Sequence, residues 1–570
     1  MVVPRVKCRG TLVVVSIFGL VLVAGLALSL AMHMKTKEGS RSRPPRSSEA
    51  PPPPSDWNWN GATDAIARTC RVTSYPDVCV KELMSFPGAA AATVDPEQLV
   101  PMSMNATRRR LVDALSDVKT IAAAASHDGR AASAYQDCVD LLDAAADLLH
   151  RSEDAFMTSS SNRDDDVATW LSAALTYHDT CNDSLHEVSD SEDVHGMKPR
   201  MVAFLAKSNL AEHLSNSLAI FANNNYNNRS SSSSTLKDSD CSDEHNDDMV
   251  VAQDGTGTHR TISDAVNAAP AHSPRRVVIR VKAGTYTESV VVPRNKTNLT
   301  LAGAGVNRTI LVGSRNVVDH RITTFRTATV SVLGDRFIMR DLTVENRAGP
   351  EKAQAVALLV SADEAVIFRC AILGYQDTLY AHAHRQFYRD CDVAGTVDFV
   401  AGNAAAVLQN CTLWARRPKR GQRNTVTAQG RRHAHQNTGV SVHRCRLLPS
   451  SPELLLDQDH HPKITYLGRP WRPYARVVYM MSSMADHIHA AGWLPWGDDG
   501  GVMPPDTVYY GEYQNTGPGA SVAQRVAWPG HHVITTPEEA INFTVGSFIA
   551  GSAWLPPTKL PFDAGLLFTQ

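Results

Sequence analysis

The sequence predicts a multidomain protein in which a parallel β-helix follows an all-α helical bundle and an N-terminal transmembrane helix. Three features predict it: an uncharged stretch near the N-terminus, an Ala- and Leu-rich segment with helical spacing, and a recurring strand-bearing unit in the second half. The chain of 570 residues is long enough for two or three compact units. Its formal net charge of −2 gives no indication of nucleic-acid binding.

The uncharged stretch runs from Thr11 to Met32 and follows three basic residues. It is long enough to cross a bilayer as one helix, which favours a signal anchor within residues 1–37 over a long cleaved signal peptide. Either interpretation directs the chain into the secretory pathway, with membrane contact through residues 11–32 before any processing. Eight Asn-x-Ser/Thr sequons agree with this route and predict a glycoprotein; they begin at Asn105, Asn182, Asn228, Asn295, Asn298, Asn307, Asn410 and Asn542.

Three segments follow the membrane span. Residues 38–60 are rich in Ser, Arg and Pro and predict an extended stalk. Residues 61–222 are rich in Ala and Leu, and stretches such as Ala134–Leu149 carry apolar residues at helical spacing, which predicts an antiparallel helical bundle. Residues 223–248 are rich in Asn, Ser and Asp and predict a linker.

From residue 249 to residue 570 the sequence pattern changes to short β-branched runs separated by Gly, Asn and Asp. One strand-bearing unit recurs, and Cys370, Cys391 and Cys411 within it lie 21 and 20 residues apart. A period near 20 with one such strand per unit and no helical pattern between units favours a parallel β-helix over a leucine-rich repeat, whose Leu consensus is missing. The units begin at Phe337, Val366, Gln386, Val407 and Val440.

Eight cysteines fall into two sets of four, one in each predicted domain. Even sets suit disulfides in an oxidising compartment, and the alternative is that all eight are buried free thiols. In the β-helix, pairing of Cys370 with Cys391 and of Cys411 with Cys445 is feasible because stacked positions lie one coil apart, although the sequence cannot prove either pair. The bundle set is Cys70, Cys79, Cys138 and Cys181.

Four polar residues have the spacing of stacked coils. Gln354, Gln376 and Asp398 follow one another at intervals of 22 residues, and Asp377 lies next to Gln376. Residues one coil apart stack at about 4.8 Å, so two carboxamides and two carboxylates are expected on one patch. Neighbouring carboxylates push their pKa values apart, which leaves one ionised and the other more readily protonated.

This division suits an ester hydrolase. The ionised carboxylate attacks the ester carbonyl, the protonated one gives a proton to the leaving alkoxide, and carboxamide N–H groups stabilise the oxyanion. A cation is then needed to orient the nucleophile. Arg469, within Leu467-Gly-Arg-Pro-Trp471, is the candidate because its planar fork can grip a carboxylate at two points.

At these residues the chain resembles the plant pectin methylesterases. The resemblance implies a right-handed parallel β-helix that needs no metal or cofactor and demethylesterifies homogalacturonan. It makes Asp398 the nucleophile and Asp377 the general acid/base, and it gives Gln354 and Gln376 the oxyanion site. It also assigns substrate binding to Gln354, Thr324, Arg469 and Trp471. The matching segments are Gly349–Leu358, Gly374–Tyr380, Gln386–Cys391, Gly395–Asn403 and Leu467–Trp471, with Thr323–Arg326 around Thr324.

One departure qualifies the resemblance. Where the family usually carries an aromatic residue before Gly-Asn, this chain has Ala401, which affects local packing of the cleft or the grip on substrate rather than the chemistry. A basic cluster invites a role in binding demethylated pectin, but long basic side chains in loops are more often simply solvated. The cluster comprises Arg416, Arg417, Lys419, Arg420, Arg423, Arg431 and Arg432.

The helical unit resembles the pectin methylesterase inhibitor domain, a four-helix bundle. This resemblance rests on Thr69–Cys79, Gln136–Cys138, Trp170–Leu175 and Thr180-Cys181. It implies that Cys70 pairs with Cys79 and Cys138 with Cys181, and it suggests inhibitor-family proteins or the chain's own bundle as partners. Family members with this layout usually carry a basic processing motif between the domains, and residues 222–249 contain none.

Other functions fit less well. A pectate lyase would need a Ca²⁺ site of clustered acids, and a polygalacturonase would space its carboxylates for glycoside chemistry. A catalytically inert β-helix whose bundle acts as an inhibitor would be favoured by loss of a catalytic Asp, yet Asp377 and Asp398 are both present. The prediction is therefore a pectinesterase, made as a membrane-anchored precursor and working in the cell wall after processing. Trp471 and Trp493 are each open to a core-packing interpretation.

Overall fold

The computed structural model describes residues 64–86, 95–124, 129–158, 163–193, 196–228, 249–451, 464–497 and 504–566. The chain divides into two compact units, Met1–Asn58 and Trp59–Gln570, and the described residues belong to the second. The predicted transmembrane helix at 11–32 and nearly all of the stalk at 38–60 fall in the first unit, outside these ranges. Among the described helices, none combines the length and the apolar character needed to cross a membrane.

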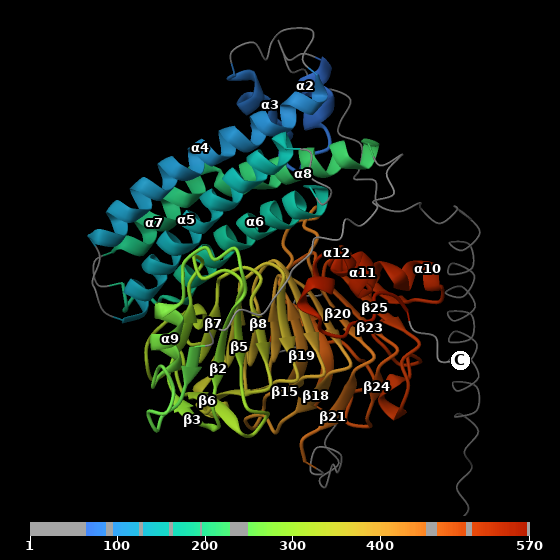
Figure 1. Cartoon of the computed structure of the whole chain (residues 1–570). Helices are drawn as coiled ribbons and strands as arrows, with labels where there is room; N and C mark the ends of the chain where they lie inside the picture. Colours follow the sequence, from blue (N-terminus) through green and yellow to red (C-terminus); the bar gives the residue numbers. More distant parts are fainter. Residues whose placement is uncertain are drawn as a thin grey trace, which may run out of the picture. The chain divides into compact units, whose positions relative to one another are not determined.

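Four long helices form the bundle: α4 (Pro96–Ala123), α5 (Gly129–Met157), α6 (Arg163–Glu187) and α8 (Leu210–Asn228). Helices α4 and α6 each pack against both α5 and α8, which closes the bundle around an apolar core (Figure 1). Helix α8 continues through Asn228, so the linker predicted from residue 223 begins later than expected. Shorter helices complete this region: α2 (Asp64–Cys70), α3 (Pro76–Met84) and α7 (Met197–Ser208).

The bundle contains the two disulfides that the family resemblance implies. Cys70 pairs with Cys79 and ties α2 to α3, and Cys138 pairs with Cys181 and ties α5 to α6. All four cysteines are buried in the bundle core.

The second half of the chain is a parallel β-helix of three sheets, whose strands stack side by side in Figure 1. The first sheet contains β1 (Met249–Val251), β2 (Val277–Val281), β5 (Leu299–Ala302), β8 (Ile338–Arg340), β11 (Ala365–Phe368), β14 (Arg385–Arg389), β17 (Ala405–Gln409), β20 (Gly439–His443), β23 (Arg476–Met480), β25 (Tyr509–Tyr513) and β26 (His531–Val533). The second contains β3 (Gly284–Thr287), β6 (Thr309–Gly313), β9 (Thr343–Asn346), β12 (Ala371–Leu373), β15 (Asp392–Gly395), β18 (Thr412–Ala415), β21 (Arg446–Pro449) and β24 (Ser483–Met484). The third contains β4 (Val290–Val292), β7 (Val330–Val332), β10 (Leu358–Val360), β13 (Leu379–Ala381), β16 (Val400–Gly402), β19 (Asn424–Gln429) and β22 (Thr465–Pro470).

Each recurring sequence unit contains two strands, where the sequence predicted one. The unit begins in a strand of the first sheet, bends, and continues in a strand of the second sheet. The bend is made by a single residue with positive φ, a conformation that Asn and Asp tolerate better than most residues. The bend residues are Asp341, Arg369, Asp390, Asn410 and Arg444, with φ between 49° and 59°.

Alternation along the strands separates two apolar layers. In β11, Ala365 and Ile367 point into the core of the β-helix, whereas Val366 and Phe368 point outward. The outward residues are covered by the C-terminal segment, which carries α10 (Pro537–Ala540), η5 (Ile541–Phe543), α11 (Val545–Phe548), α12 (Gly551–Trp554) and η6 (Pro556–Thr558). Helix α9 (Ile262–Ala268) contacts β1, β2 and β4.

The four cysteines of the β-helix are free and buried, so the expected pairs Cys370 with Cys391 and Cys411 with Cys445 do not form. They lie just after the bends of consecutive coils, with their side chains stacked in one direction. Parallel Cα–Cβ bonds keep neighbouring Cβ atoms about 4.8 Å apart, beyond the 3.5–4.5 Å typical of a disulfide. The thiols instead donate to backbone carbonyls such as Met339 O, and burial raises the pKa of Cys370 to about 12.

Candidate active site

Residues that precede three neighbouring strands of the third sheet form the candidate site. Gln354 pairs with Gln376 across adjacent coils before β10 and β13. Leu379 pairs with Val400, so two positions earlier Asp377 lies level with Asp398. The second interval is therefore 21 residues rather than the 22 used in the sequence argument, and Asp398 stacks on Asp377 instead of Gln376. The structure still brings all four residues to one patch.

Asp398 is buried and held at both carboxylate oxygens. Arg469 on β22 donates from Nε to Oδ1 at 2.8 Å and from Nη2 to Oδ2 at 2.7 Å. Thr425 on β19 donates its hydroxyl to Oδ1 at 2.6 Å and accepts from the backbone N–H of Asp398 at 2.9 Å. This two-point grip fixes the direction of the carboxylate.

Asp377 has the opposite environment. Burial, and after it the negative charge of Asp398, raise the pKa of Asp377 well above its ordinary value, while Arg469 opposes this effect. Asp377 and Asp398 both have positive φ, at 59° and 53°, in the turns that lead into the third sheet. Two carboxyl groups in different surroundings therefore lie side by side, and the roles that the sequence argument gives them remain predictions.

The two glutamines lie beside this pair and are partly exposed. Their backbones are joined in the coil stack, since Ala355 N donates to Gln376 O at 3.3 Å and Val317 N donates to Gln354 O at 3.2 Å. Neither carboxamide hydrogen-bonds to another residue in the part of the chain that the structure describes. Their N–H groups are thus available to a ligand next to the two carboxyl groups.

Two further residues named from the sequence border the patch. Trp471 follows β22 and packs against Tyr380, with ring centroids 6.3 Å apart. Thr324 begins the short helix η1 (Thr324–Arg326), and a second short helix, η2 (Pro350–Lys352), leads to Gln354. Trp493, in contrast, is a core residue that stacks on Tyr510 at 4.0 Å.

Sequence reasoning missed two residues of the site. Thr425 lies 27 residues after Asp398, because the loop after β18 lengthens that coil, and no regular spacing pointed to it. Trp496 places its ring 4.4 Å from the Arg469 guanidinium, which adds a cation–π contact to the residue that grips Asp398. The sequence offered one signal for Trp496, its position as a second tryptophan three residues after Trp493.

Ala401 lies on β16 and is 8% exposed, between Tyr380 on β13 and Ala428 on β19. With two alanines in succession along this row, Tyr380 is free to pack against Trp471. Ala401 therefore lies within the third sheet beside the site, and both carboxyl groups are in place.

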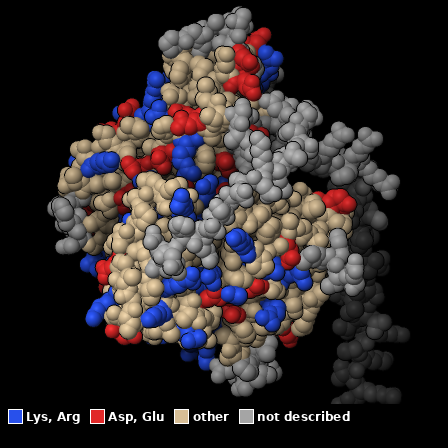
Figure 2. Space-filling model, viewed as in Figure 1, with Lys and Arg blue, Asp and Glu red and all other residues tan. Residues whose placement is uncertain are grey.

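The basic cluster does not act as one group. Arg416 stacks on Tyr375 at 4.0 Å, and Lys419 pairs with Glu351 at 2.9 Å. Arg431 is half-buried and donates to the carbonyls of Ala434 and Gln436. On the face shown in Figure 2, basic and acidic side chains are interspersed and no continuous patch of either sign forms.

The helical bundle contacts this face of the β-helix directly. Glu187, at the end of α6, accepts a hydrogen bond from the backbone N–H of Thr324 at 2.8 Å. Thr176 of α6 accepts from the Asn403 side chain at 2.8 Å. On α5, buried Asp137 accepts from the Thr323 hydroxyl at 2.6 Å. Helices α5 and α6 thus contact the segment that carries Thr324.

Comparison with known proteins identifies the family. The pectinesterase family model matches residues 248–552, and the plant invertase/pectin methylesterase inhibitor model matches residues 64–220. The chain is 44% identical over 528 residues to probable pectinesterase/pectinesterase inhibitor 61 of Arabidopsis thaliana, covering 88% of each chain. It is 40% identical over 525 residues to pectinesterase 3 of Citrus sinensis, covering 87% of this chain and 88% of the relative.

A solved structure agrees with these matches. The pectin methylesterase from carrot is 50% identical, with a TM-score of 0.53, and the alignment covers 59% of this chain and all of the carrot chain. The chain therefore belongs to the pectinesterase family and is a carboxylic ester hydrolase of pectin that carries an inhibitor-like helical domain before its catalytic β-helix.

Proposed function

We propose that Asp398 is the nucleophile and Asp377 the general acid and base in demethylesterification of homogalacturonan. The observation that carries this proposal is the pairing of a carboxylate gripped at two points by Arg469 with a neighbouring carboxyl group whose pKa is raised. The first can attack while ionised, and the second holds a proton at a pH where an ordinary carboxyl group has lost it.

The reaction then has two steps. Asp398 attacks the carbonyl carbon of the methyl ester, and the N–H groups of Gln354 and Gln376 stabilise the negative oxygen. Asp377 protonates the methoxide, methanol leaves, and an acyl-enzyme anhydride remains. Water, losing a proton to Asp377, hydrolyses the anhydride and restores both carboxyl groups to their starting states. Thr324, Gln354, Arg469 and Trp471 position the sugar.

The test is methanol release by the catalytic part alone. A protease site placed within residues 229–248 would allow the bundle to be removed after the full chain has folded. We expect Asp398→Asn to abolish methanol release from highly methylated pectin. Asp341→Asn is the matched control, because Asp341 also has positive φ and also accepts two hydrogen bonds from an arginine, Arg369. Activity that survives Asp398→Asn would overturn the assignment.

We further propose that the bundle is an internal partner that keeps the intact chain inactive. Its support is that Glu187 contacts Thr324 and that Asp137 contacts Thr323 and Arg326, so α5 and α6 hold the segment that carries the proposed substrate-binding residue Thr324. Methanol release should rise at least tenfold when the cleaved bundle is removed. Equal rates before and after removal would contradict inhibition by the bundle.

The precursor would be held in a secretory membrane by residues 11–32, and the released part would work in the cell wall.

A further inference from the structure

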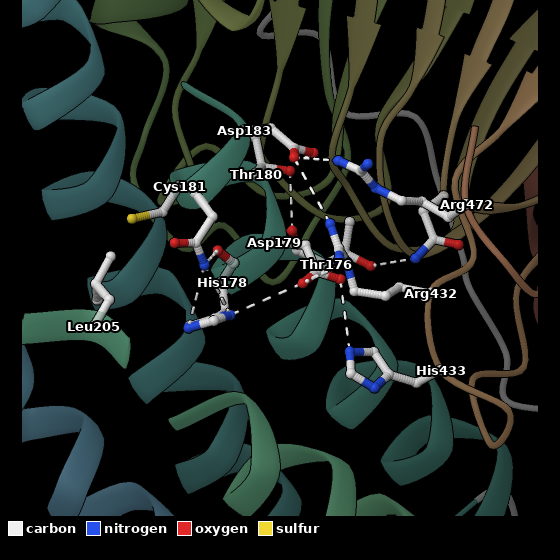
Figure 3. A network of polar contacts seen from close by, with 12 residues as sticks. Thr176, His178, Asp179, Thr180, Cys181, Asp183, Leu205, Arg432, His433 and Arg472 are labelled. Carbon is white, nitrogen blue, oxygen red and sulfur yellow. Dashed lines mark hydrogen bonds and ion pairs between the residues drawn. The ribbon is translucent and has the colours of Figure 1, made fainter. Parts of the chain in front are cut away.

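The three sheets of the β-helix differ in what covers their outer faces. The C-terminal segment covers the first sheet. Beside the third sheet, Arg472 pairs with Asp183 of α6 (Figure 3), and the loop after β19 places Arg432 3.1 Å from Asp179 of the same helix. Strands β15, β18 and β21 of the second sheet lie on the side of the β-helix away from the bundle (Figure 1). In the described part of the chain, the apolar clusters of the bundle and of the C-terminal segment include no residue of these three strands.

The outer face of the second sheet carries a row of apolar side chains. Ala394 of β15, Trp414 of β18 and Leu448 of β21 are neighbours in the strand register, and Leu373 of β12 pairs with Ala394. Leu413, next to Trp414 on the same strand, points into the core, so this row points outward. Leu373, Trp414 and Leu448 are partly exposed. An indole ring flanked by small or aliphatic side chains is thus presented to solvent.

Polar groups border the Trp414 ring on the two neighbouring strands. The indole N–H of Trp414 donates to Asp392 Oδ1 at 2.9 Å, which draws the ring toward β15 and along the sheet. Arg446 of β21 donates from Nη2 to the Thr412 hydroxyl at 2.8 Å, so its guanidinium leans over β18. Thr412 and Trp414 are two residues apart on one strand, a distance of about 7 Å. The cation and the aromatic ring are therefore close enough for one sugar unit to contact both.

Both charged groups keep capacity for a ligand. Arg446 is exposed, and it forms no ion pair with a carboxylate of a described residue. Asp392 is partly exposed, and its Oδ2 accepts no hydrogen bond from a described residue. A guanidinium binds a carboxylate at two points, a carboxylate oxygen accepts from a hydroxyl, and an indole offers an apolar face to the C–H groups of a sugar ring. The three side chains together suit an acidic sugar.

The loop that leaves β18 decides between an acidic and a neutral polymer. Between residues 415 and 423 this loop carries five cationic side chains and no acidic one. Of these, Arg420 and Arg423 are exposed and form no ion pair with a carboxylate of a described residue. Their charge next to Trp414 attracts a polyanion and gives a neutral polysaccharide no advantage.

We propose that Trp414, Arg446 and Asp392 form a surface site, separate from the catalytic patch, that binds an unesterified stretch of homogalacturonan. A galacturonate ring stacks on Trp414, its carboxylate bonds to Arg446, and one of its hydroxyls donates to Asp392. The site requires only that the chain meets pectin, the polymer of its family, and not the roles proposed for Asp398 and Asp377. Because it lies on the second sheet, the intact chain binds the polymer while the bundle is still docked.

Binding by the intact chain tests this site without any chemistry. The full chain is titrated calorimetrically with a long unesterified oligogalacturonate at low salt. We expect Arg446→Gln to bind about 10- to 150-fold more weakly than wild type, as for lost hydrogen bonds to a charged group. Trp414→Ala should lose about 2- to 12-fold in affinity, and Trp414→Phe should keep most of it because an aromatic ring remains. Arg369→Gln, which removes an exposed charge at the bend before β12, is the control and should bind as wild type.

Ligand choice and catalysis separate the outcomes. Polyglutamate should bind more weakly than oligogalacturonate, and a neutral galactan should not compete. Equal oligogalacturonate binding by wild type and Trp414→Ala/Arg446→Gln, or equally tight binding of polyglutamate, would overturn the surface site.

Methanol release from short esterified oligomers by the catalytic part should be the same in this double variant and in wild type. A loss of that rate in a folded double variant would place Trp414 in the catalytic cleft and overturn a separate site. Absence of methanol release in wild type, with oligogalacturonate binding through Trp414 and Arg446 intact, would instead overturn the catalytic roles and leave the surface site standing.

Discussion

Asp398 is oriented by groups from two other coils of the β-helix. Arg469 supplies charge from β22, and Thr425 supplies a neutral hydrogen bond from β19 that also ties down the backbone of Asp398. The hydroxyl adds a third contact to a carboxylate that Arg469 already holds at both oxygens, which makes Thr425 a positioning residue for the proposed nucleophile.

We expect Thr425→Val to lower kcat about 10- to 150-fold, which corresponds to loss of a hydrogen bond to a charged group. Thr425→Ser should retain most of the rate, because serine keeps the hydroxyl. Thr427→Val is the control on the same strand, since Thr427 donates to the carbonyl of Leu467 rather than to Asp398. The kcat of all three variants is measured from methanol release across a range of pH. Equal losses for Thr425→Val and Thr427→Val would show a general packing effect.

At the scale of the element, the turn from β15 into β16 places Asp398, and Gly395 allows the turn to close. A Cβ at Gly395 would meet the Cβ of Phe399 and would lie 2.5 Å from the Thr378 hydroxyl and 2.8 Å from the Tyr375 carbonyl oxygen. Backbone and strand residues surround it, so little can move aside.

Gly395→Ala should therefore destabilise the catalytic part by about 1–3 kcal/mol, as overpacking does, and should lower activity by displacing Asp398. Gly565→Ala is the control, because a Cβ there meets no atom within 4 Å. Chemical denaturation measures the stability and methanol release the activity. An unchanged midpoint in Gly395→Ala would contradict the close approach seen in the turn.

The cysteine stack is a second feature of the elements that can be tested. Alkylation of the unfolded, unreduced chain should label the four β-helix cysteines Cys370, Cys391, Cys411 and Cys445. The bundle cysteines, which form two disulfides, should be labelled only after reduction. Peptide mapping by mass spectrometry distinguishes the two sets. A disulfide between Cys370 and Cys391 would show that the stack can rearrange to bring two Cβ atoms closer.

At the scale of the whole molecule, docking of the bundle depends on protons. Burial raises the pKa of Glu187 from 4.5 to about 7 where it accepts from Thr324 N. The docked state therefore holds this proton more tightly than the free bundle does. The contribution of protonated Glu187 to the free energy of docking is fully present below pH 4.5 and is lost as pH rises through about 7. Burial raises the pKa of Asp183 as well. The pKa of Asp179 is lowered, because a hydrogen bond from His178 and the nearby His433 and Arg432 outweigh the effect of burial.

After cleavage of the linker, the bundle should dissociate from the β-helix more readily at pH 7 than at pH 4.5. The change in the pKa of Glu187 corresponds to ~3 kcal/mol, which solvent screening at its partly exposed side reduces. Glu187→Gln should flatten this dependence. Glu153→Gln is the control, because Glu153 pairs with Arg108 inside the bundle. Analytical ultracentrifugation across the pH range would measure the association of the cleaved bundle with the β-helix. Tighter association at pH 7 than at pH 4.5 would contradict the proposed role of Glu187.

Much of this protein can be predicted from short-range patterns in the sequence. Helical spacing predicted the bundle and the recurring unit predicted the β-helix, because both depend on residues close in the chain. The motifs around Asp377, Asp398 and Arg469 indicated the ester hydrolase, and the structure brings these residues together. The proposed role of each remains a prediction for mutagenesis to test.

Only the tertiary structure decided which coils align and what covers them. The interval of 21 residues that stacks Asp377 on Asp398, the contact of Thr425 with Asp398 and the free state of Cys370 all follow from loop lengths and side-chain directions summed over whole coils. Asp179 and Asp183 of α6 reach Arg432 and Arg472 across about 250 residues or more of chain. Such contacts depend on packing between domains, so short-range sequence patterns do not predict them.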